Sequence, residues 1–297
     1  MLRPEGYRSG FVSVVGRPNV GKSTLLNAFM GRKIAITSAK PQTTRNAIRG
    51  ILTGEAWQII FVDTPGLHKP KTLLGERLND VVRRTLSEVD AIVFVLDALS
   101  PSGTGDEFVA REVLRTGTPA ICVVNKMDAA GPVKMAPQLQ AAASLGDWRE
   151  IVPVSAKQGT NVPMLQEMLV GLLPEGPQFY PEDAVTDQPR ELLLAEIIRE
   201  KALSLLHEEV PHSIATSVES VSERPDGIVD VEATVYVERD SQKGIVIGKG
   251  GAMLKEIGTR ARSELEWLLG GKVFLRLQVK VAKDWQRNPK HLQRLGY

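Results

Sequence analysis

The segment from Gly16 to Ser23 constrains the fold of this chain more than any other part of the sequence. It reads Gly-Arg-Pro-Asn-Val-Gly-Lys-Ser and matches the phosphate-loop pattern G-x-x-x-x-G-K-[ST]. The segment lies between an apolar run at residues 11–15 and an apolar helical stretch, which is the position that a phosphate-binding loop needs. A fortuitous glycine turn is the alternative, but the full pattern rarely arises by chance.

Each residue type in this loop has a chemical reason. The glycines let backbone N–H groups wrap phosphates, Lys22 can reach the β and γ phosphates, and the Ser23 hydroxyl can ligate Mg²⁺. We therefore predict a phosphate site formed by Gly16, Asn19, Val20, Gly21, Lys22, Ser23 and Thr24.

Short β-branched runs alternate with helix-like stretches from residue 11 to about 173. The apolar runs are residues 11–15, 58–62, 91–96, 120–124 and 151–154. Strands so continuously apolar are buried on both faces, which predicts a mostly parallel sheet covered by helices. We therefore expect a doubly wound α/β domain.

The composition changes after this domain. Residues 173–189 contain four prolines and a glycine, which cannot hold a long helix and indicate a linker. The pattern then runs helix (192–208), two alternating strands (214–222 and 228–238), a helical stretch ending in Gly248-Lys-Gly-Gly251, a longer helix (253–269) and a strand (273–281). We predict a first domain at residues 1–175, a linker at 176–190 and an α+β domain at 191–297.

The overall composition is that of an ordinary soluble globular protein. Lys and Arg number 37 against 35 Asp and Glu, and 42% of the residues are apolar. The single cysteine, Cys122, cannot form an intrachain disulfide and is expected to be a small core residue. Because the longest apolar run is residues 91–96, we expect neither a membrane span nor a secretion signal, and we expect a cytoplasmic protein.

Further motifs stand at the ends of later strands and point to a guanine nucleotide. Asp63-Thr-Pro-Gly66 supplies a carboxylate to the outer shell of a metal and an N–H that can sense a γ phosphate. In Asn125-Lys-Met-Asp128, the carboxylate can accept the N1 and 2-amino protons of guanine, a pair that adenine does not offer. Ser155-Ala-Lys157 places another N–H near the base oxygen. The predicted base site is therefore Asn125, Lys126, Asp128, Ser155, Ala156 and Lys157.

This ordered set resembles the translation-factor-related GTPases, and its detail resembles one family among them, the Era GTPases. The matching segments are Gln42-Thr-Thr-Arg45, Asp63-Thr-Pro-Gly-Leu-His68, the pair Leu74-Gly75, Asn79, and the run from Arg239 to Gly251. The resemblance covers nearly the whole chain. It implies a Ras-like phosphate-loop GTPase domain followed by a type II KH domain, with hydrolysis of GTP to GDP and phosphate.

The resemblance also implies the catalytic residues Lys22, Thr44, Asn19 and Gly66. Thr44, rather than Thr43, is expected to complete the Mg²⁺ shell. Leu67 stands where Ras-type proteins carry a glutamine that orients water, so intrinsic hydrolysis is expected to be slow. Relatives with a hydrophobic residue there often use K⁺, for which Asn19 is the candidate ligand, and a simple turn role for Asn19 is the alternative.

The second domain carries a candidate RNA site. Gly248-Lys-Gly-Gly251 lies between two helical stretches, as in a type II KH fold, where this loop clamps about four single-stranded nucleotides. Residues 191–242 carry 4 basic and 12 acidic side chains, whereas residues 243–297 carry 12 basic and 4 acidic ones. A glycine break in a helical hairpin and a solvated basic face are the alternatives. We assign RNA contacts to Gly248, Lys249, Gly250, Gly251, Lys243, Lys255, Arg260 and Lys283.

Three functions agree with these observations. The resemblance implies a GTP-controlled RNA-binding protein that acts in assembly of the 30S ribosomal subunit and in maturation of the 3′ end of 16S ribosomal RNA. The alternatives are a GTP-dependent tRNA-modification factor and an RNA-binding scaffold in which GTP is structural. We expect a monomer, and the sequence leaves open the peripheral contact with the inner face of the cell membrane that members of the family can make.

Overall fold

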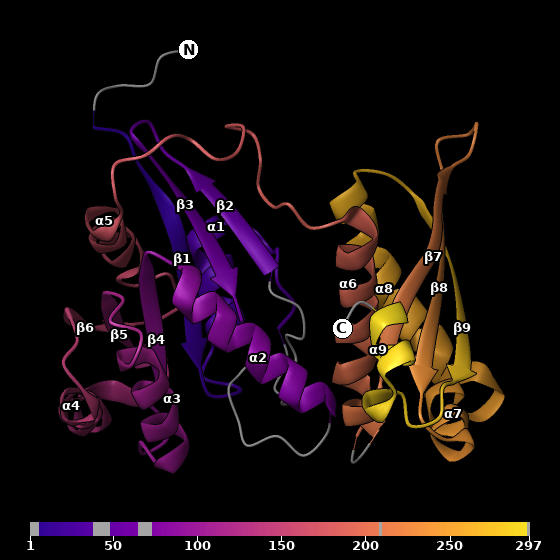
Figure 1. The fold of residues 1–297 in the computed structure, drawn as a ribbon. Coiled ribbons are helices and arrows are strands. Elements are labelled where there is room, and N and C mark those ends of the chain that lie inside the picture. The colour runs from indigo at the N-terminus through magenta and orange to yellow at the C-terminus, as the bar shows by residue number, and fades with distance from the viewer. Residues whose placement is uncertain (1–5, 38–47, 65–72, 208–209, 296–297) are drawn as a thin grey trace. The chain divides into compact units, whose positions relative to one another are not determined.

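The computed structural model of the chain is shown in Figure 1 and describes residues 6–37, 48–64, 73–207 and 210–295. These residues divide into two compact units, each with a sheet of its own. The first unit contains the described residues up to 187, except for 36–37 and 73–74. The second contains those short stretches and the residues from 188 onward.

The first unit is built around a six-stranded sheet in the order β2-β3-β1-β4-β5-β6. Its strands are β1 (Arg8–Gly16), β2 (Ile48–Thr53), β3 (Trp57–Asp63), β4 (Ala91–Asp97), β5 (Ala120–Asn125) and β6 (Glu150–Val154). Neighbouring strands are parallel, except for β2 and β3, which form an antiparallel pair at one edge. The doubly wound, mostly parallel sheet that the sequence predicts is therefore confirmed.

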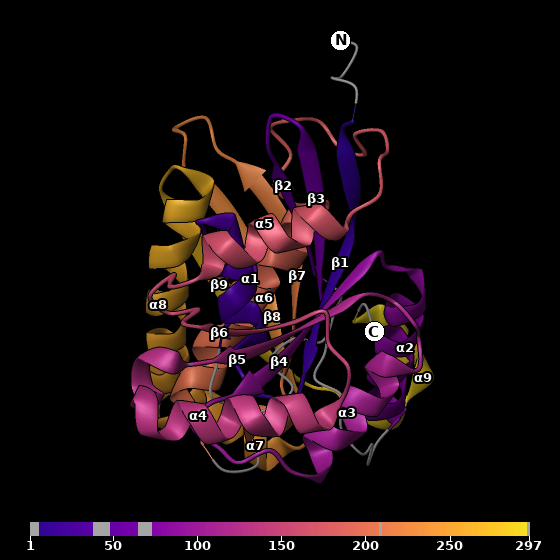
Figure 2. The same cartoon turned by 90° about the vertical axis from the view of Figure 1, so that its left-hand side faces the viewer.

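Helices cover both faces of this sheet and can be followed in Figures 1 and 2. They are α1 (Lys22–Met30), α2 (Leu73–Glu88), α3 (Thr104–Leu114), α4 (Met127–Leu145) and α5 (Val162–Leu172). Along β4 the side chains alternate in direction: Val93 and Val95 join an apolar cluster with α1 and α5, whereas Phe94 joins another with α2, α3 and α4. Burial on both faces explains why β4 is apolar at every position before its last.

Cys122 lies in the second of these clusters and is fully buried. Burial raises the pKa of its thiol to about 12, as expected for a small core residue rather than a reactive one. In the part of the chain that the structure describes, no helix is both long enough and apolar enough to cross a bilayer.

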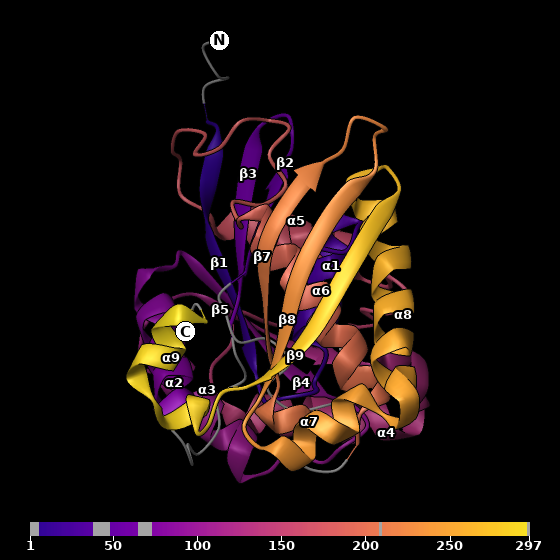
Figure 3. The same cartoon turned by 90° about the vertical axis from the view of Figure 1, so that its right-hand side faces the viewer.

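The second unit follows the expected order of a helix, two strands, two helices and a strand. Its elements are α6 (Arg190–Leu205), β7 (Ala215–Glu223), β8 (Val229–Val237), α7 (Asp240–Ile247), α8 (Ala252–Leu269), β9 (Val273–Val281) and α9 (Pro289–Arg294). Strands β7 and β8 are antiparallel, whereas β8 and β9 are parallel, as Figure 3 shows. The expected α+β arrangement of this half is confirmed.

The core of the second unit lies on one face of its sheet. Ile198 of α6 and Leu265 of α8 pack in a buried cluster with alternate strand residues such as Val231 and Val279. On β9 the intervening positions are exposed, and Phe274 is 47% accessible there. One buried face and one open face produce the alternating pattern from which these strands were predicted.

Residues 174–187 pack along the first unit and are not a free tether. The side chain of Gln58 in β3 accepts hydrogen bonds from the backbone of Phe179 and Tyr180 and donates one to the Tyr180 carbonyl. Arg49 in β2 forms an ion pair with Asp187 at 2.8 Å, and α6 begins three residues after that contact. The domain boundaries near 175 and 190 stay a prediction, but this segment is anchored along its length.

Candidate functional site

The phosphate loop follows β1 directly and leads into α1, as the sequence predicts. Gly16 and Gly21 have φ angles of 156° and 100°, in a region that L side chains rarely adopt. A Cβ on Gly16 would lie 2.5 Å from the carbonyl oxygen of Val95, and one on Gly21 would lie 2.3 Å from the side-chain nitrogen of Asn125. Both glycines are therefore required by backbone conformation and by close packing.

Lys22 is a buried lysine at the start of α1. Its ammonium group donates to the carbonyl oxygens of Gly16 at 3.1 Å and of Arg17 at 2.9 Å. Burial lowers the pKa of Lys22 to about 8, and the nearby Asp63 carboxylate opposes that effect. A phosphate placed next to this amine would favour its charged form, so the site is suited to an anion.

Ser23 and Asp63 form the corner in which a metal ion is expected. The Ser23 hydroxyl donates to Asp63 Oδ2 over 2.8 Å, although the two residues are 40 positions apart. Asp63 is fully buried at the end of β3. Hydroxyl and carboxylate oxygens are the hard ligands that Mg²⁺ prefers, so the two residues fit the predicted ion.

The predicted base motifs come together at the ends of β5 and β6. Asn125 donates from Nδ2 to the Val20 carbonyl at 2.9 Å and accepts at Oδ1 from the Ala156 N–H at 3.0 Å. It thus joins the phosphate loop to the Ser-Ala-Lys motif. The Ser155 hydroxyl donates to Asp128 Oδ1 over 2.7 Å, which orients the carboxylate assigned to guanine. Lys157 of the predicted base site directly follows Ala156, and Thr24 of the predicted phosphate site lies in α1.

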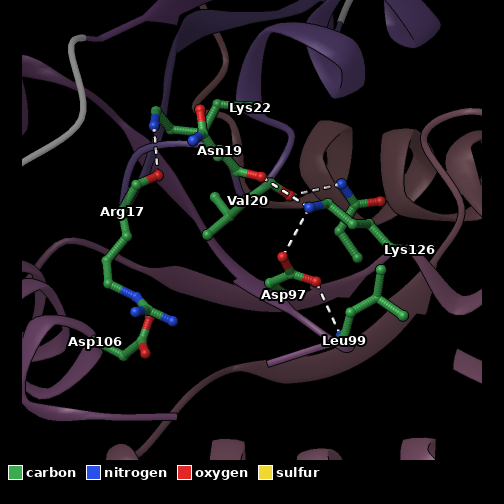
Figure 4. Close-up of polar contacts among 9 residues, drawn as sticks. Arg17, Asn19, Val20, Lys22, Asp97, Leu99, Asp106 and Lys126 are labelled. Carbon is green, nitrogen blue, oxygen red and sulfur yellow. Dashed lines mark hydrogen bonds and ion pairs between the residues drawn. The ribbon is translucent and has the colours of Figure 1, made fainter. Parts of the chain in front are cut away.

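The contacts of Lys126 identify Asp97 as a residue that sequence reasoning missed. The φ of Lys126 is 69°, and its ammonium donates to the Asn19 carbonyl at 2.8 Å and pairs with Asp97 at 2.7 Å (Figure 4). Asp97 ends β4 and also accepts from the Leu99 N–H. A signal for it was present, because Asp97 follows an apolar run as Asp63 and Asn125 do.

Part of the predicted catalytic set lies outside the described residues. This holds for Thr44 and the rest of Gln42-Thr-Thr-Arg45, and also for Gly66, Leu67 and His68. Asn19 is described and has a φ of 67°, a conformation that asparagine tolerates better than most residues. Since that backbone requirement alone accounts for an asparagine here, the role of Asn19 in holding K⁺ stays a prediction.

The glycine loop of the second unit joins α7 to α8 through a short turn at Lys249–Gly251. Gly248, Gly250 and Gly251 all have positive φ, between 60° and 81°. A Cβ on Gly248 would lie 2.7 Å from Cβ of Met253, so the backbone passes close to α8 there. Lys249 and Gly250 are exposed at the tip, where a nucleic-acid backbone could approach.

A groove of about 430 Å³ begins at this loop and runs between α8 and β9. It is lined by Gly251, Leu254, Lys255, Gly258, Thr259, Arg262, Leu275 and Leu277. An apolar floor with cations along one wall suits single-stranded nucleotides, whose bases need apolar or hydrogen-bonding surroundings and whose phosphates need positive charge.

The structure does not bring every predicted RNA residue to this groove. Arg260 forms an ion pair with Glu256 at 2.7 Å on another side of α8. On a helix of 3.6 residues per turn, Arg260 lies roughly 140° from Lys255, whereas Arg262 lies roughly 20° from it. Helical phase could therefore have identified Arg262 from the sequence.

The two remaining predicted RNA contacts lie elsewhere in the second unit. Lys243 is half-buried on α7, and Lys283 is exposed in the turn after β9. Their contact with RNA stays a prediction.

Two protein-family models match the chain. The model described as a 50S ribosome-binding GTPase matches residues 11–126, and the model described as a KH domain matches residues 209–286. The first range contains the phosphate loop and ends within the Asn-Lys-Met-Asp motif, and the second contains the glycine loop and its groove. These matches confirm the expected GTPase and KH domains.

Curated relatives match almost the whole chain. GTPase Era of Nocardioides sp. is 54% identical over 302 residues, which cover 98% of this chain and 96% of the relative. GTPase Era of Mycobacterium tuberculosis (strain H37Rv) is also 54% identical, and the match covers 98% of this chain and 99% of the relative.

Solved structures agree. An Era variant from Aquifex aeolicus bound to GDP and AlF4⁻ is 41% identical with a TM-score of 0.94, over 98% of this chain and 99% of that one. Era in complex with MgGDPNP and nucleotides 1506–1542 of 16S ribosomal RNA is 40% identical with a TM-score of 0.92, over the same shares of the two chains. The chain therefore belongs to the Era GTPases, and it binds and hydrolyses GTP.

Proposed function

We propose that this protein is a nucleotide-controlled switch that binds the 3′ end of 16S ribosomal RNA during assembly of the 30S subunit and maturation of that RNA end. One observation carries the proposal: a single chain holds an interlocked guanine-nucleotide site and a glycine loop that opens onto a basic groove. The related complex with nucleotides 1506–1542 of 16S ribosomal RNA supports this choice of RNA. A protein with these partners works in the cytoplasm.

In the nucleotide site, the described residues have separate roles. Lys22 binds the β and γ phosphates while the Gly16 and Arg17 carbonyls hold its ammonium group. Ser23 would hold Mg²⁺ directly, with Asp63 as its outer-shell partner. Asp128 accepts the N1 and 2-amino protons of guanine. Bound Mg²⁺ supplies positive charge at the phosphates, and this chain's own residues orient the nucleotide around it.

In the RNA site, the loop and the groove divide the work. The exposed backbone around Lys249 and Gly250 clamps the sugar-phosphate chain. The glycines of the loop have no side chain, so the RNA can approach the backbone closely. Lys255 and Arg262 attract phosphates along one wall, while Leu275 and Leu277 offer an apolar surface to bases.

The identity of the RNA is tested by crosslinking in cells followed by sequencing of the bound fragments. Reads concentrated at the 3′ end of 16S ribosomal RNA are expected, and reads concentrated in tRNA would replace the proposal with the tRNA-modification alternative. In vitro, the 1506–1542 segment is compared with an RNA of equal length and composition in shuffled order. Equal affinity for the two RNAs would contradict sequence-selective binding.

The switch itself is tested by affinity in two nucleotide states. Coupling between two binding sites is reciprocal, so GTP should tighten RNA binding by the factor by which RNA tightens GTP. Fluorescence anisotropy with the RNA segment, at one salt concentration, should give an affinity about tenfold higher with a non-hydrolysable GTP analogue than with GDP. Equal affinities would make the second domain a tether, and absence of multiple-turnover phosphate release would make GTP structural.

A further inference from the structure

One ion pair at the phosphate loop is not explained by any motif. Arg17, directly after Gly16, directs its Nε to Asp106 Oδ1 at 2.7 Å across 89 positions of sequence (Figure 4). The Asp106 side chain is 0% exposed and that of Arg17 is 31% exposed. The pair joins the first residues of the loop to the first turn of α3.

The carboxylate of this pair is held in place by its own surroundings. Asp106 Oδ2 accepts from the Gly103 N–H at 3.0 Å, and the Asp106 N–H donates to the Gly103 carbonyl at 2.8 Å. Backbone N–H groups at the start of a helix also favour a negative charge there. The acceptor for Arg17 is therefore fixed by the helix and does not depend on the arginine for its position.

The arginine side chain has a defined path to this acceptor. Its stem passes directly over Gly105, where an added Cβ would lie 2.7 Å from Cδ of Arg17. A buried carboxylate at one end and close packing along the stem restrict the rotamers of Arg17. The Arg17 side chain and backbone share one Cα, so the same two restraints also limit the orientation of the Arg17 carbonyl.

That carbonyl is one of two oxygens that orient Lys22, with an Nζ to oxygen distance of 2.9 Å. The second half of the loop is tied elsewhere, through the Asn19 carbonyl to Lys126 and the Val20 carbonyl to Asn125. Arg17 and Asp106 act on the first half, which carries the carbonyls that hold the lysine.

We propose that Arg17 is a positioning residue for the GTPase reaction, which acts through its carbonyl on Lys22 while Asp106 anchors its side chain. The inference rests on the proposed contact of Lys22 with the β and γ phosphates. Loss of the pair should therefore weaken the binding of nucleotides that carry those phosphates and leave contacts to guanine, ribose and α phosphate unchanged.

The test compares Arg17→Ala with the unmodified protein on GTP, GDP, GMP and guanosine, by calorimetry or competition. Affinity for GTP and GDP should fall about tenfold, because the carbonyl at position 17 is no longer held where it orients the Lys22 ammonium, while GMP and guanosine change less than about twofold. Arg17→Lys, which can still reach the carboxylate, should recover part of the loss. Arg83→Ala is the matched control. Arg83 also pairs with a carboxylate of α3, Glu112, at a distance of 3.1 Å, but it is not part of the phosphate loop.

Each result has a defined meaning. An equal loss for all four ligands, or no recovery by Arg17→Lys, would show that Arg17 only stabilises the fold, and unchanged affinity for GDP would overturn the proposal outright. If the unmodified protein bound GDP no better than GMP, the assignment of Lys22 would fail instead, independently of Arg17. Asp106→Asn, which can still cap α3, should follow Arg17→Ala if the pair acts as one unit.

Discussion

The nucleotide site and the RNA groove are constructed in opposite ways. In the nucleotide site, polar side chains are held in place by hydrogen bonds. Asn125 is 2% exposed and joins two separate loops, and the carboxylate of Asp128, which is exposed, is oriented by the Ser155 hydroxyl. In the groove, Lys255 and Arg262 are exposed on one face of α8, and Lys249 of the loop is exposed as well. One site is a fixed framework, and the other is a charged surface with an apolar floor.

This difference indicates how each site selects its ligand. Buried hydrogen-bonding groups reject a ligand that leaves them unpaired, so fixed polar geometry discriminates between similar bases. Exposed cations attract any phosphate chain, and salt screens that attraction. The comparison predicts chemical selectivity that resists salt at the first site, and salt-sensitive affinity at the second.

The largest expected effect tests the fixed framework. Asp128→Asn exchanges an acceptor for an amide donor, which suits the 2-oxo group of xanthine and not the 2-amino group of guanine. The ratio of GTP to xanthosine triphosphate affinity should change about a thousandfold, measured by competition against a fluorescent guanine nucleotide. Asp147→Asn, an exposed aspartate before β6, is the control and should leave the ratio unchanged. Comparable affinity of the unmodified protein for ATP and GTP would remove the assignment.

The next effect tests the charged surface. Lys249→Asp with Gly250→Asp places negative charge at the loop tip and should lower RNA affinity about a hundredfold without changing GTP affinity. Gly271→Asp with Lys272→Asp makes the same charge change beyond the far end of α8 and should have a smaller effect. Anisotropy measurements at two salt concentrations would show whether the lost affinity is the salt-sensitive part. An equal loss in both double variants would mean that net charge matters and the loop does not.

Much of the fold could be predicted because its strands have distinct surroundings. The inner strands β4 and β5 are buried on both faces and are apolar at every position before the last, which identifies a covered parallel sheet. Strand β2 was not predicted, since its sequence Ile-Arg-Gly-Ile-Leu-Thr has no continuous apolar run and its partner lies on one side only. The anchoring of residues 174–187 depends on side chains such as Gln58, whose partners are more than 100 positions away.

The candidate site divides in the same way. Residues within contiguous motifs, such as Lys22 and Asn125, could be predicted because the chemistry needs those types at that spacing. Their supports are less predictable. Asp97 stands at the end of an apolar run, but its partner Lys126 lies 29 positions away, and Asp106 meets Arg17 across 89 positions. Only the folded sheet, which brings the carboxyl ends of separate strands to one edge, places these groups together.

A smaller effect concerns the cation at the fixed framework. With leucine at position 67, hydrolysis should be slow in sodium buffer and several-fold faster in potassium buffer of equal ionic strength. Asn19→Ala should abolish this difference in hydrolysis rate between the two buffers and should still bind GDP. Asn19→Gly is the matched variant, because glycine accepts the positive φ of 67° without strain and removes only the side chain. If phosphate release in the unmodified protein is the same in both salts, the cation proposal fails.

The smallest expected effect follows from the buried amine of Lys22. Its pKa of about 8 in the empty site means that this group is mostly charged at pH 7 and mostly neutral above pH 8.5. A bound β phosphate needs the charged form, so binding above pH 8 must take up a proton, and that uptake lowers affinity as pH rises through the pKa. GDP affinity should fall about fourfold between pH 7 and 8.6.

Proton uptake gives the sharper measurement of this effect. Calorimetry at pH 8 in buffers of different ionisation enthalpy should show roughly half a proton taken up per GDP. GMP, which lacks the β phosphate, is the matched ligand and should bind without uptake. The same uptake for GMP would assign the titration to a group other than Lys22. No uptake with either ligand would mean that the lysine stays charged in the empty site, because its bonds to the Gly16 and Arg17 carbonyls outweigh the cost of burial.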